Sequence, residues 1–300
     1  MDALTIESIS KSFDGVCAVQ DLSVCVPAGS IYGFLGPNGA GKTTALRMVM
    51  NIIYPDSGTI RILGEQKLAC AKDRVGYMPE ERGLYPRMTV GGVLTYLGEL
   101  KGLDRPAAEA AVMYWLKEVD LSDWAARKVH DLSRGMQQRL QFVATVLHEP
   151  ALLILDEPFS GLDPVNTELV RSIMLRLKES GCTIVLSTHM MEQAESLCDR
   201  ILLIHRGRKV LDGTLDEVRE RYQVGCVAVE LEGDAGFIAQ LPMVTSVRPD
   251  GRELDIMLTQ SGEDQALLAA LVGRVRVRSF RIKTPTLREI FVSAVREHDA

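Results

Sequence analysis

Gly36-Pro37-Asn38-Gly39-Ala40-Gly41-Lys42-Thr43-Thr44 has the form G-x-x-x-x-G-K-[ST], the pattern of a loop that wraps phosphate groups. Glycines allow backbone turns that a Cβ atom forbids, so that successive N–H groups can converge on one anion. Lys42 adds a mobile positive charge, and the Thr43 hydroxyl is a hard oxygen ligand suited to Mg²⁺. The flanking residues predict a buried strand over 30–35 and a helix over 44–50 whose positive end faces the phosphates.

The composition of the chain limits the classes of protein to which it can belong. With 300 residues, of which 46% are hydrophobic, it is long enough for one large domain and a smaller one. A net charge of −6 argues against a nucleic-acid surface. No apolar run approaches the roughly 18–20 residues that a membrane span needs, and the N-terminus lacks the regions of a secretory signal. Six scattered cysteines without a C-x-x-C pair are typical of reduced thiols, so we expect a cytoplasmic protein.

Residues 1–220 predict a β-rich core interrupted by helices. The stretch 3–30 alternates as an antiparallel hairpin does, and 58–64 predicts another strand. Continuous apolar runs at 152–155 and 183–187 are typical of strands buried on both faces of a mostly parallel sheet, and 200–212 predicts a hairpin. Helical periodicity over 89–129 carries two apolar stripes, formed by Val93, Leu94, Leu97 and Leu100 and by Val112, Trp115, Leu116 and Val119.

The character of the chain changes after about residue 222. Strands are expected at 227–231, 244–248, 254–258 and 275–282, and helices at 266–272 and 286–295. This pattern predicts a small α+β domain of ferredoxin-like type. We therefore divide the chain into a domain over 1–220, with a helical insert at about 88–131, and a second domain over 221–300.

Two acids end the apolar strand at 152–155. Nucleotide sites form at the carboxyl edge of such sheets, where Asp156 is placed to hold Mg²⁺. Glu157 can polarise the water that attacks a γ-phosphate. The alternative is a solvated strand end, but the pairing with the phosphate loop favours the functional interpretation.

Further motifs point to one family. Leu132-Ser133-Arg134-Gly135-Met136-Gln137-Gln138-Arg139 is similar to the signature sequence of ATP-binding-cassette (ABC) ATPases. Ser160-Gly161-Leu162-Asp163-Pro164 resembles that family's D-loop, and Ser187-Thr188-His189 resembles its strand-end switch histidine. Phe13 stands where the family places an aromatic residue that stacks on adenine, although a core aromatic of the hairpin is the alternative. The resemblance covers residues 3 to about 220.

The resemblance implies a fold and a set of roles. The fold is an α/β P-loop NTPase cassette with a mixed-sheet core, an antiparallel β subdomain and a helical insert, here followed by the small α+β domain. The cofactors are ATP and Mg²⁺, and the activity is ATP hydrolysis. Within one cassette, the resemblance implies that Lys42 and the 36–44 loop bind phosphate and that Thr43 and Asp156 bind the metal. It implies that Glu157 activates the attacking water and that His189 orients this water. Between cassettes, it implies that Ser133 and Gly135 complete the site of the opposite cassette and that Asp163 communicates between the two.

The chain departs from the family pattern at two places. Glu80, in Gly76-Tyr77-Met78-Pro79-Glu80, stands where the family generally has glutamine. A carboxylate can still bind Mg²⁺ but adds repulsion against the γ-phosphate, and we hypothesise that Glu80 links nucleotide state to a partner surface. The signature carries Arg134 and Met136 where glycine and glutamine are commoner.

Among ABC proteins, the sequence favours the ATPase subunit of a transporter. A single cassette without a membrane span implies that the transmembrane permease is a separate subunit and that the cassette docks on it at the inner face of the membrane. The resemblance also implies a second cassette as partner, and we expect a homodimer rather than a heterodimer. Alternatives are soluble ABC ATPases of translation, DNA repair or cofactor assembly.

The segment 283–292 resembles the ending of exporter-type cassettes that pair with ABC-2 membrane subunits. There Thr286 is expected to cap a helix with one apolar face, formed by Leu287, Ile290, Phe291 and Val295.

Overall fold

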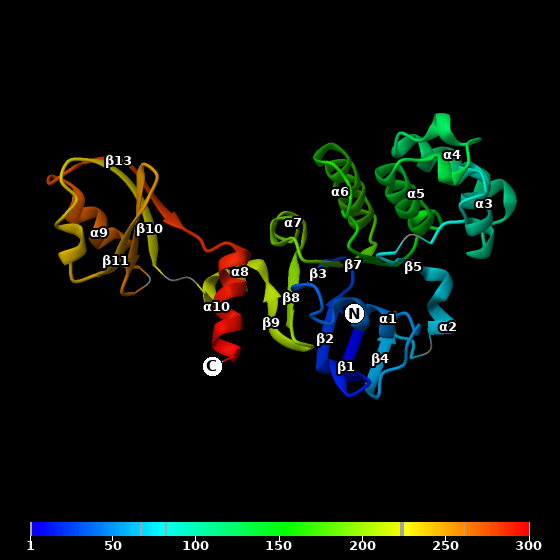
Figure 1. Ribbon diagram of the computed structural model, residues 1–300, viewed down its shortest axis with the longest axis horizontal. Coiled ribbons are helices and arrows are strands. Elements are labelled where there is room, and N and C mark those ends of the chain that lie inside the picture. Colours follow the sequence, from blue (N-terminus) through cyan, green and yellow to red (C-terminus); the bar gives the residue numbers. More distant parts are fainter. Residues whose placement is uncertain (1, 67, 82, 223–224, 261, 300) are drawn as a thin grey trace. The chain divides into compact units, whose positions relative to one another are not determined.

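The structure is a computed structural model that describes residues 2–66, 68–81, 83–222, 225–260 and 262–299 (Figure 1). Its contacts divide the chain into unit 1, Met1–Leu215, and unit 2, Asp216–Ala300. Among the residues that are described, every helix is too short or too polar to cross a membrane.

A six-stranded sheet forms the centre of unit 1. Five of its strands are parallel, and the sixth, at one edge, is antiparallel. Every residue of β3, β6 and β7 is buried, which confirms the prediction of strands covered on both faces. In spatial order the strands are β5 (Val75–Met78), β6 (Leu152–Asp156), β7 (Thr183–Thr188), β3 (Ile31–Leu35), β8 (Arg200–His205) and β9 (Arg208–Thr214).

A second, antiparallel sheet in unit 1 has the order β2-β1-β4. The predicted hairpin is its first pair, β1 (Asp2–Phe13) and β2 (Val16–Pro27), and β4 (Ser57–Ile62) lies beside β1. One hydrophobic core joins the two sheets through helix α1 (Lys42–Val49), which begins two residues before the predicted start. Its members include Leu4, Tyr32, Phe34, Leu46 and Ile154.

The insert between β5 and β6 is helical (Figure 1). It contains α3 (Val90–Leu100), α4 (Arg105–Glu118), the 3-10 turns η2 (Ser122–Trp124) and η3 (Val129–Asp131), and α5 (Arg134–Val146). Outside the insert, α2 (Leu68–Ala71) and the 3-10 turn η1 (Lys72–Arg74) precede β5, α6 (Pro164–Glu179) follows β6, and α7 (Met191–Leu197) follows β7.

One member of the predicted apolar stripes is misplaced. Leu100 is 60% exposed, whereas Val93 and Leu94 are buried. Leu100 is the last residue of α3 and is exposed although it follows Val93 by seven positions, the spacing of one helix face. Gly98 takes the inward position instead, where an added Cβ would lie 3.0 Å from Leu147 Cδ2 of the α5 segment. The second stripe, on α4 and its end, is buried as predicted.

Unit 2 contains a four-stranded antiparallel sheet in the order β11-β12-β10-β13. Along the chain the elements follow a β-α-β-β-α-β pattern with one 3-10 turn in the first helical place. They are β10 (Cys226–Glu232), η4 (Ile238–Gln240), β11 (Val244–Asp250), β12 (Glu253–Leu258), α9 (Asp264–Leu271) and β13 (Arg276–Lys283), with α8 (Leu215–Arg221) before them and α10 (Leu287–Asp299) after them.

The start and the apolar face of α10 agree with the sequence. Thr286 Oγ1 accepts a hydrogen bond from Glu289 N at 3.3 Å, and Glu289 Oε2 accepts one from Thr286 N at 2.8 Å, which together form a capping box. Leu287 and Ile290 are buried.

Candidate nucleotide-binding site

The phosphate loop connects β3 to α1. Gly41 is the N-cap of α1 and has φ 105°, and an added Cβ there would lie 2.4 Å from Ala18 O. The loop is held from the β8–β9 turn, because Gly207 N donates to Ala40 O at 2.9 Å and Gly207 O accepts from Gln20 N at 2.8 Å. A glycine N-cap has no side chain to bond the first N–H groups of the helix, so these groups are available to an anion.

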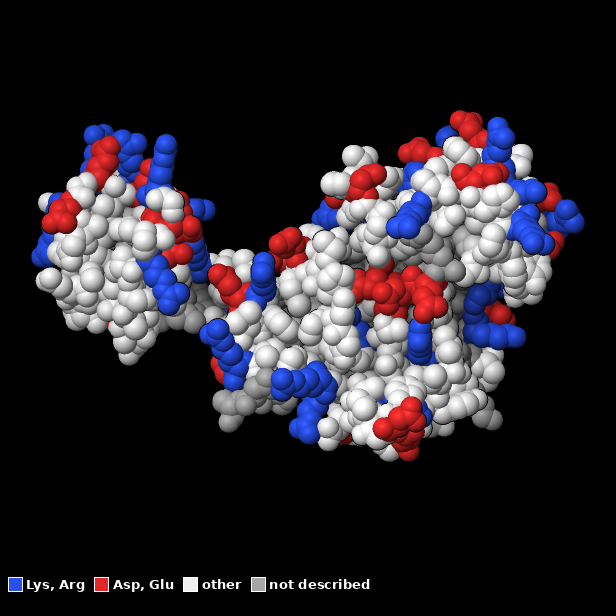
Figure 2. All heavy atoms as spheres, in the orientation of Figure 1, with Lys and Arg blue, Asp and Glu red and all other residues white. Residues whose placement is uncertain are grey.

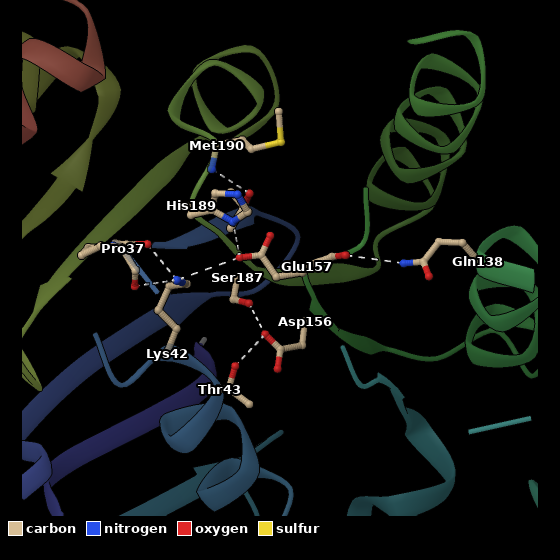
Figure 3. A network of polar contacts seen from close by, with 11 residues as sticks. Pro37, Lys42, Thr43, Gln138, Asp156, Glu157, Ser187, His189 and Met190 are labelled. Atoms are coloured by element: carbon tan, nitrogen blue, oxygen red, sulfur yellow. Dashed lines mark hydrogen bonds and ion pairs between the residues drawn. The ribbon is translucent and has the colours of Figure 1, made fainter. Parts of the chain in front are cut away.

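Lys42 spans the loop from the first turn of α1. Its buried ammonium donates to Gly36 O at 2.7 Å and Pro37 O at 3.1 Å, and lies 3.9 Å from Glu157 Oε1 (Figure 3). Burial lowers the Lys42 pKa, and the charges of Glu157, Asp156 and Glu80 act in the opposite direction. The ammonium is thus presented among carboxylates at the edge where β3 and β6 end.

Asp156 ends β6 and is fully buried. Its Oδ1 accepts from Thr43 Oγ1 at 3.2 Å and also from the Ser187 hydroxyl of β7 (Figure 3). Its Oδ2 is buried without a hydrogen-bond partner among the described residues. A buried carboxylate oxygen without a partner is costly unless a ligand satisfies it. Acidic side chains also gather on the surface below helices α5 and α6 (Figure 2).

Glu157 and His189 follow two adjacent strands and meet at the same edge. The backbone turns sharply at Glu157, where φ is 50°, and its N–H donates to Ser187 O at 3.1 Å. His189 Nδ1 lies 2.9 Å from Glu157 Oε1, the same oxygen that faces Lys42 (Figure 3). Glu157 is buried, while the His189 side chain is 49% exposed. The pair therefore reaches from the phosphate loop to the surface.

Two buried glutamines of α5 belong to the site although sequence reasoning gave them no role. Gln138 Nε2 donates to Pro158 O at 3.2 Å and Glu157 O at 3.5 Å, which ties α5 to the segment that contains Glu157. Gln141 Nε2 donates to Pro79 O at 2.8 Å and Glu81 O at 3.3 Å, and so holds the segment on both sides of Glu80. The available signal was their spacing of three, which places two amides on one helix face.

Other predicted site residues lie outside this network. Ser133 caps α5, its Oγ accepting from Met136 N at 3.3 Å, and Asp163 caps α6, accepting from Asn166 N at 2.8 Å. These two helix starts are close together, because a Cβ on Gly135 would lie 3.7 Å from Gly161 O.

Phe13 and Glu80 are both exposed. The alternative of Phe13 as a core aromatic is wrong, because the side chain ends β1 with 45% exposure. Lys11 Nζ lies 5.6 Å from the centre of its ring. Glu80 follows β5, and its charge partly opposes the lowering of the Lys42 pKa by burial.

A phosphate loop after one strand, two acids after another, and a helical insert between them define a P-loop ATPase of the cassette type. Residues 19–160 match the ABC transporter family, and residues 213–295 match the family described as ATP-binding protein DrrA1-3-like, C-terminal domain. The chain belongs to the family of ABC transporter ATP-binding subunits. It binds nucleotide and is an ATPase, and relatives of this kind dimerise and work with transmembrane components.

Individual relatives agree with this assignment. The uncharacterized ABC transporter ATP-binding protein YhaQ of Bacillus subtilis (strain 168) is 37% identical over 97% of this chain and 98% of its own. The Nod factor export ATP-binding protein I of Burkholderia lata is 39% identical over 96% of this chain and 95% of its own. A solved structure described as the ATP binding subunit of an ABC transporter has a TM-score of 0.69 and 31% identity, covering 73% of this chain and 93% of its own.

Proposed function

We propose that this chain is the ATPase subunit of an exporter, and that two identical copies close on two ATP molecules at the inner face of a membrane. The observation that carries the proposal is the network in which Lys42 and His189 both contact Glu157 Oε1 beside the phosphate loop. Support for export comes from the relative named as a Nod factor export ATP-binding protein, which is similar to this chain over 96% of its residues.

We assign the Mg²⁺ of the reaction to Thr43 and Asp156. The unpaired Asp156 Oδ2 and the neighbouring Thr43 hydroxyl are the hard oxygen donors that Mg²⁺ prefers. Glu80 supplies a further carboxylate, on a segment that Gln141 ties to α5. When bound, Mg²⁺ neutralises part of the phosphate charge.

The protein residues divide the remaining chemistry. The Lys42 ammonium and the N–H groups at the start of α1 stabilise the negative charge of the phosphates. Glu157 accepts a proton from the attacking water, and His189, hydrogen-bonded to Glu157, orients that water. Phe13 is exposed where a ring would stack on the adenine.

The second copy completes each site through Ser133 and Gly135, with Asp163 beside them. Gly135 is not required by the fold of its own chain, because a Cβ there would meet no atom closer than 3.7 Å and alanine is the better helix former. Close approach of another molecule explains the glycine.

A separate membrane subunit would dock on the insert. Tyr85 and Tyr96 are exposed by 50% and 41% and contact each other edge to face, with ring centres 6.0 Å apart. An exposed aromatic pair close in sequence to Glu80 suits a protein partner that responds to nucleotide state.

The test is the substitution Glu157→Gln, with Glu179→Gln, an exposed acid of α6, as the control. We expect the ATPase rate of E157Q to fall about a hundredfold or more, and the protein to elute as a dimer only with Mg²⁺-ATP. E179Q should behave as the wild type. Full turnover by E157Q would contradict the assignment of the base, and a variant that binds ATP but stays monomeric would contradict the homodimer.

A further inference from the structure

Unit 2 contains a cavity of about 500 Å³ between its sheet and α10. Val227, Ile256 and Leu258 point into the core with α9, and the alternate residues Cys226 and Met257 line the cavity on the opposite face. The cavity is therefore separate from the hydrophobic core of this unit.

The cavity carries an excess of positive charge. Its charged lining consists of two acids, Asp255 and Glu289, and four cations, Arg248, Lys283, Arg288 and Arg296. Both acids are already engaged, since Lys283 Nζ lies 2.7 Å from Asp255 and Glu289 accepts from Thr286 N at 2.8 Å.

The three arginines have no ion-pair partner among the residues that the structure describes. Arginines of the same sheet outside the cavity do have partners. Arg281 lies 2.7 Å from Glu253, and Arg278 pairs with Glu232. Unpaired guanidinium groups thus gather at the cavity, and guanidinium forms paired hydrogen bonds with phosphate and carboxylate.

The rest of the lining is largely apolar. Met257, Pro285 and Val292 present carbon and sulfur surface beside the arginines. A small inorganic anion would leave this surface uncovered, whereas a ligand with an apolar chain would cover it.

We propose that this cavity binds an amphiphilic organic anion, with a phosphate or carboxylate head held by Arg288 and Arg296 of α10 and Arg248 of β11, and an apolar chain against Met257 and Val292. The ligand would bridge α10 and the sheet within unit 2. This site goes beyond the proposed ATPase function and shares no residue with it.

The test uses the full chain without nucleotide, and dodecyl phosphate below its micellar concentration as the probe in titration calorimetry. We expect saturable binding that the double substitution R288A/R296A weakens at least tenfold. Arg276→Ala removes an arginine of β13 that is 83% exposed and outside the cavity, and should bind as the wild type. Equal melting temperatures of the three proteins would show that folding is intact.

Two sources of the ligand can be separated with vesicles. Flotation with phosphatidylglycerol but not phosphatidylcholine vesicles, lost in R288A/R296A, would support the cavity with a membrane lipid as its ligand. Dodecyl phosphate binding without flotation would support it with a soluble ligand. The proposal is overturned if the wild type does not bind dodecyl phosphate, or if R288A/R296A binds it as tightly as R276A. Because no ATP is present, neither result depends on the ATPase proposal.

Discussion

At the scale of single residues, Asp156 combines burial with an unpaired oxygen. Within the described chain only Oδ1 is hydrogen-bonded, and the charge is held in place for a ligand. We expect Asp156→Asn to lose ATPase activity at least a hundredfold and yet to melt about 2–4 °C higher without Mg²⁺ and nucleotide. The amide keeps an oxygen for both hydroxyls and removes a buried charge, a gain of about 1 kcal/mol.

Asp104→Asn is the matched control, because Asp104 is the exposed N-cap of α4 and asparagine caps as well. Its melting temperature under the same metal-free conditions should equal that of the wild type. If D156N melted at a lower temperature than the wild type, the buried Asp156 carboxylate would not be destabilising in the absence of the metal, which would contradict this prediction.

His148 makes stability depend on pH. Burial lowers its pKa to about 4, with Lys101 acting in the same direction, while Val75 O, 3.3 Å from Nε2, and Asp73 oppose the shift. An unfolded histidine has a pKa near 6.5, so between about pH 6.5 and 4 the unfolded state binds the extra proton and stability falls as pH falls. At pH 5 the loss is at most about 2 kcal/mol, and less because the ring is only partly buried.

The measurement is the drop in melting temperature between pH 7.5 and pH 5. We expect His148→Gln to show a drop several degrees smaller than that of the wild type, because glutamine does not titrate. His130→Gln serves as the control, since the His130 side chain is 52% exposed. An identical drop in all three proteins would refute the role of His148.

At the scale of elements, the β8–β9 turn positions the phosphate loop. Gly207 has φ 77°, and an added Cβ would lie 2.7 Å from Ala18 O, so alanine must shift the turn whose Gly207 N bonds Ala40 O. We expect Gly207→Ala to raise the KM for ATP about tenfold, a change of roughly 1.4 kcal/mol, with kcat less affected.

Gly181→Ala separates this effect from general strain. Gly181 has φ 92°, and a Cβ added there would meet no atom within 4 Å, so alanine strains the backbone at this position without a clash. Its KM for ATP should stay at the wild-type value. Equal changes of KM in both variants would mean that the turn does not position the loop.

The same elements differ in how well they can be predicted from the sequence. The strands β3, β6 and β7 and the start of α5 were predictable, because runs of apolar residues and the Ser133 cap are local signals. The contacts of Gln138 with Pro158 and of Gly207 with Ala40 depend on tertiary packing between distant segments, which no local pattern encodes. The helical periodicity also could not decide that Gly98 rather than Leu100 faces inward.

At the scale of the whole molecule, each unit has a hydrophobic core made of its own residues. The core that contains Tyr32 and Ile154 belongs to unit 1, and the core that contains Val227 and Leu267 belongs to unit 2. Units with separate cores unfold as separate cooperative blocks. We therefore expect two transitions when the full chain is melted in a calorimeter.

Each proposed ligand should move only one of these transitions. At a hundred times its Kd, a ligand stabilises the block that binds it by about 2.7 kcal/mol. Mg²⁺-ATP added to E157Q, which binds without turnover, should raise the transition of unit 1 alone, and Lys42→Ala should abolish that shift. Dodecyl phosphate should raise the transition of unit 2 alone, and R288A/R296A should abolish that shift. A single transition that both ligands raise would contradict this expectation. It would mean that the two cores unfold as one block, so that a ligand bound to either unit stabilises both.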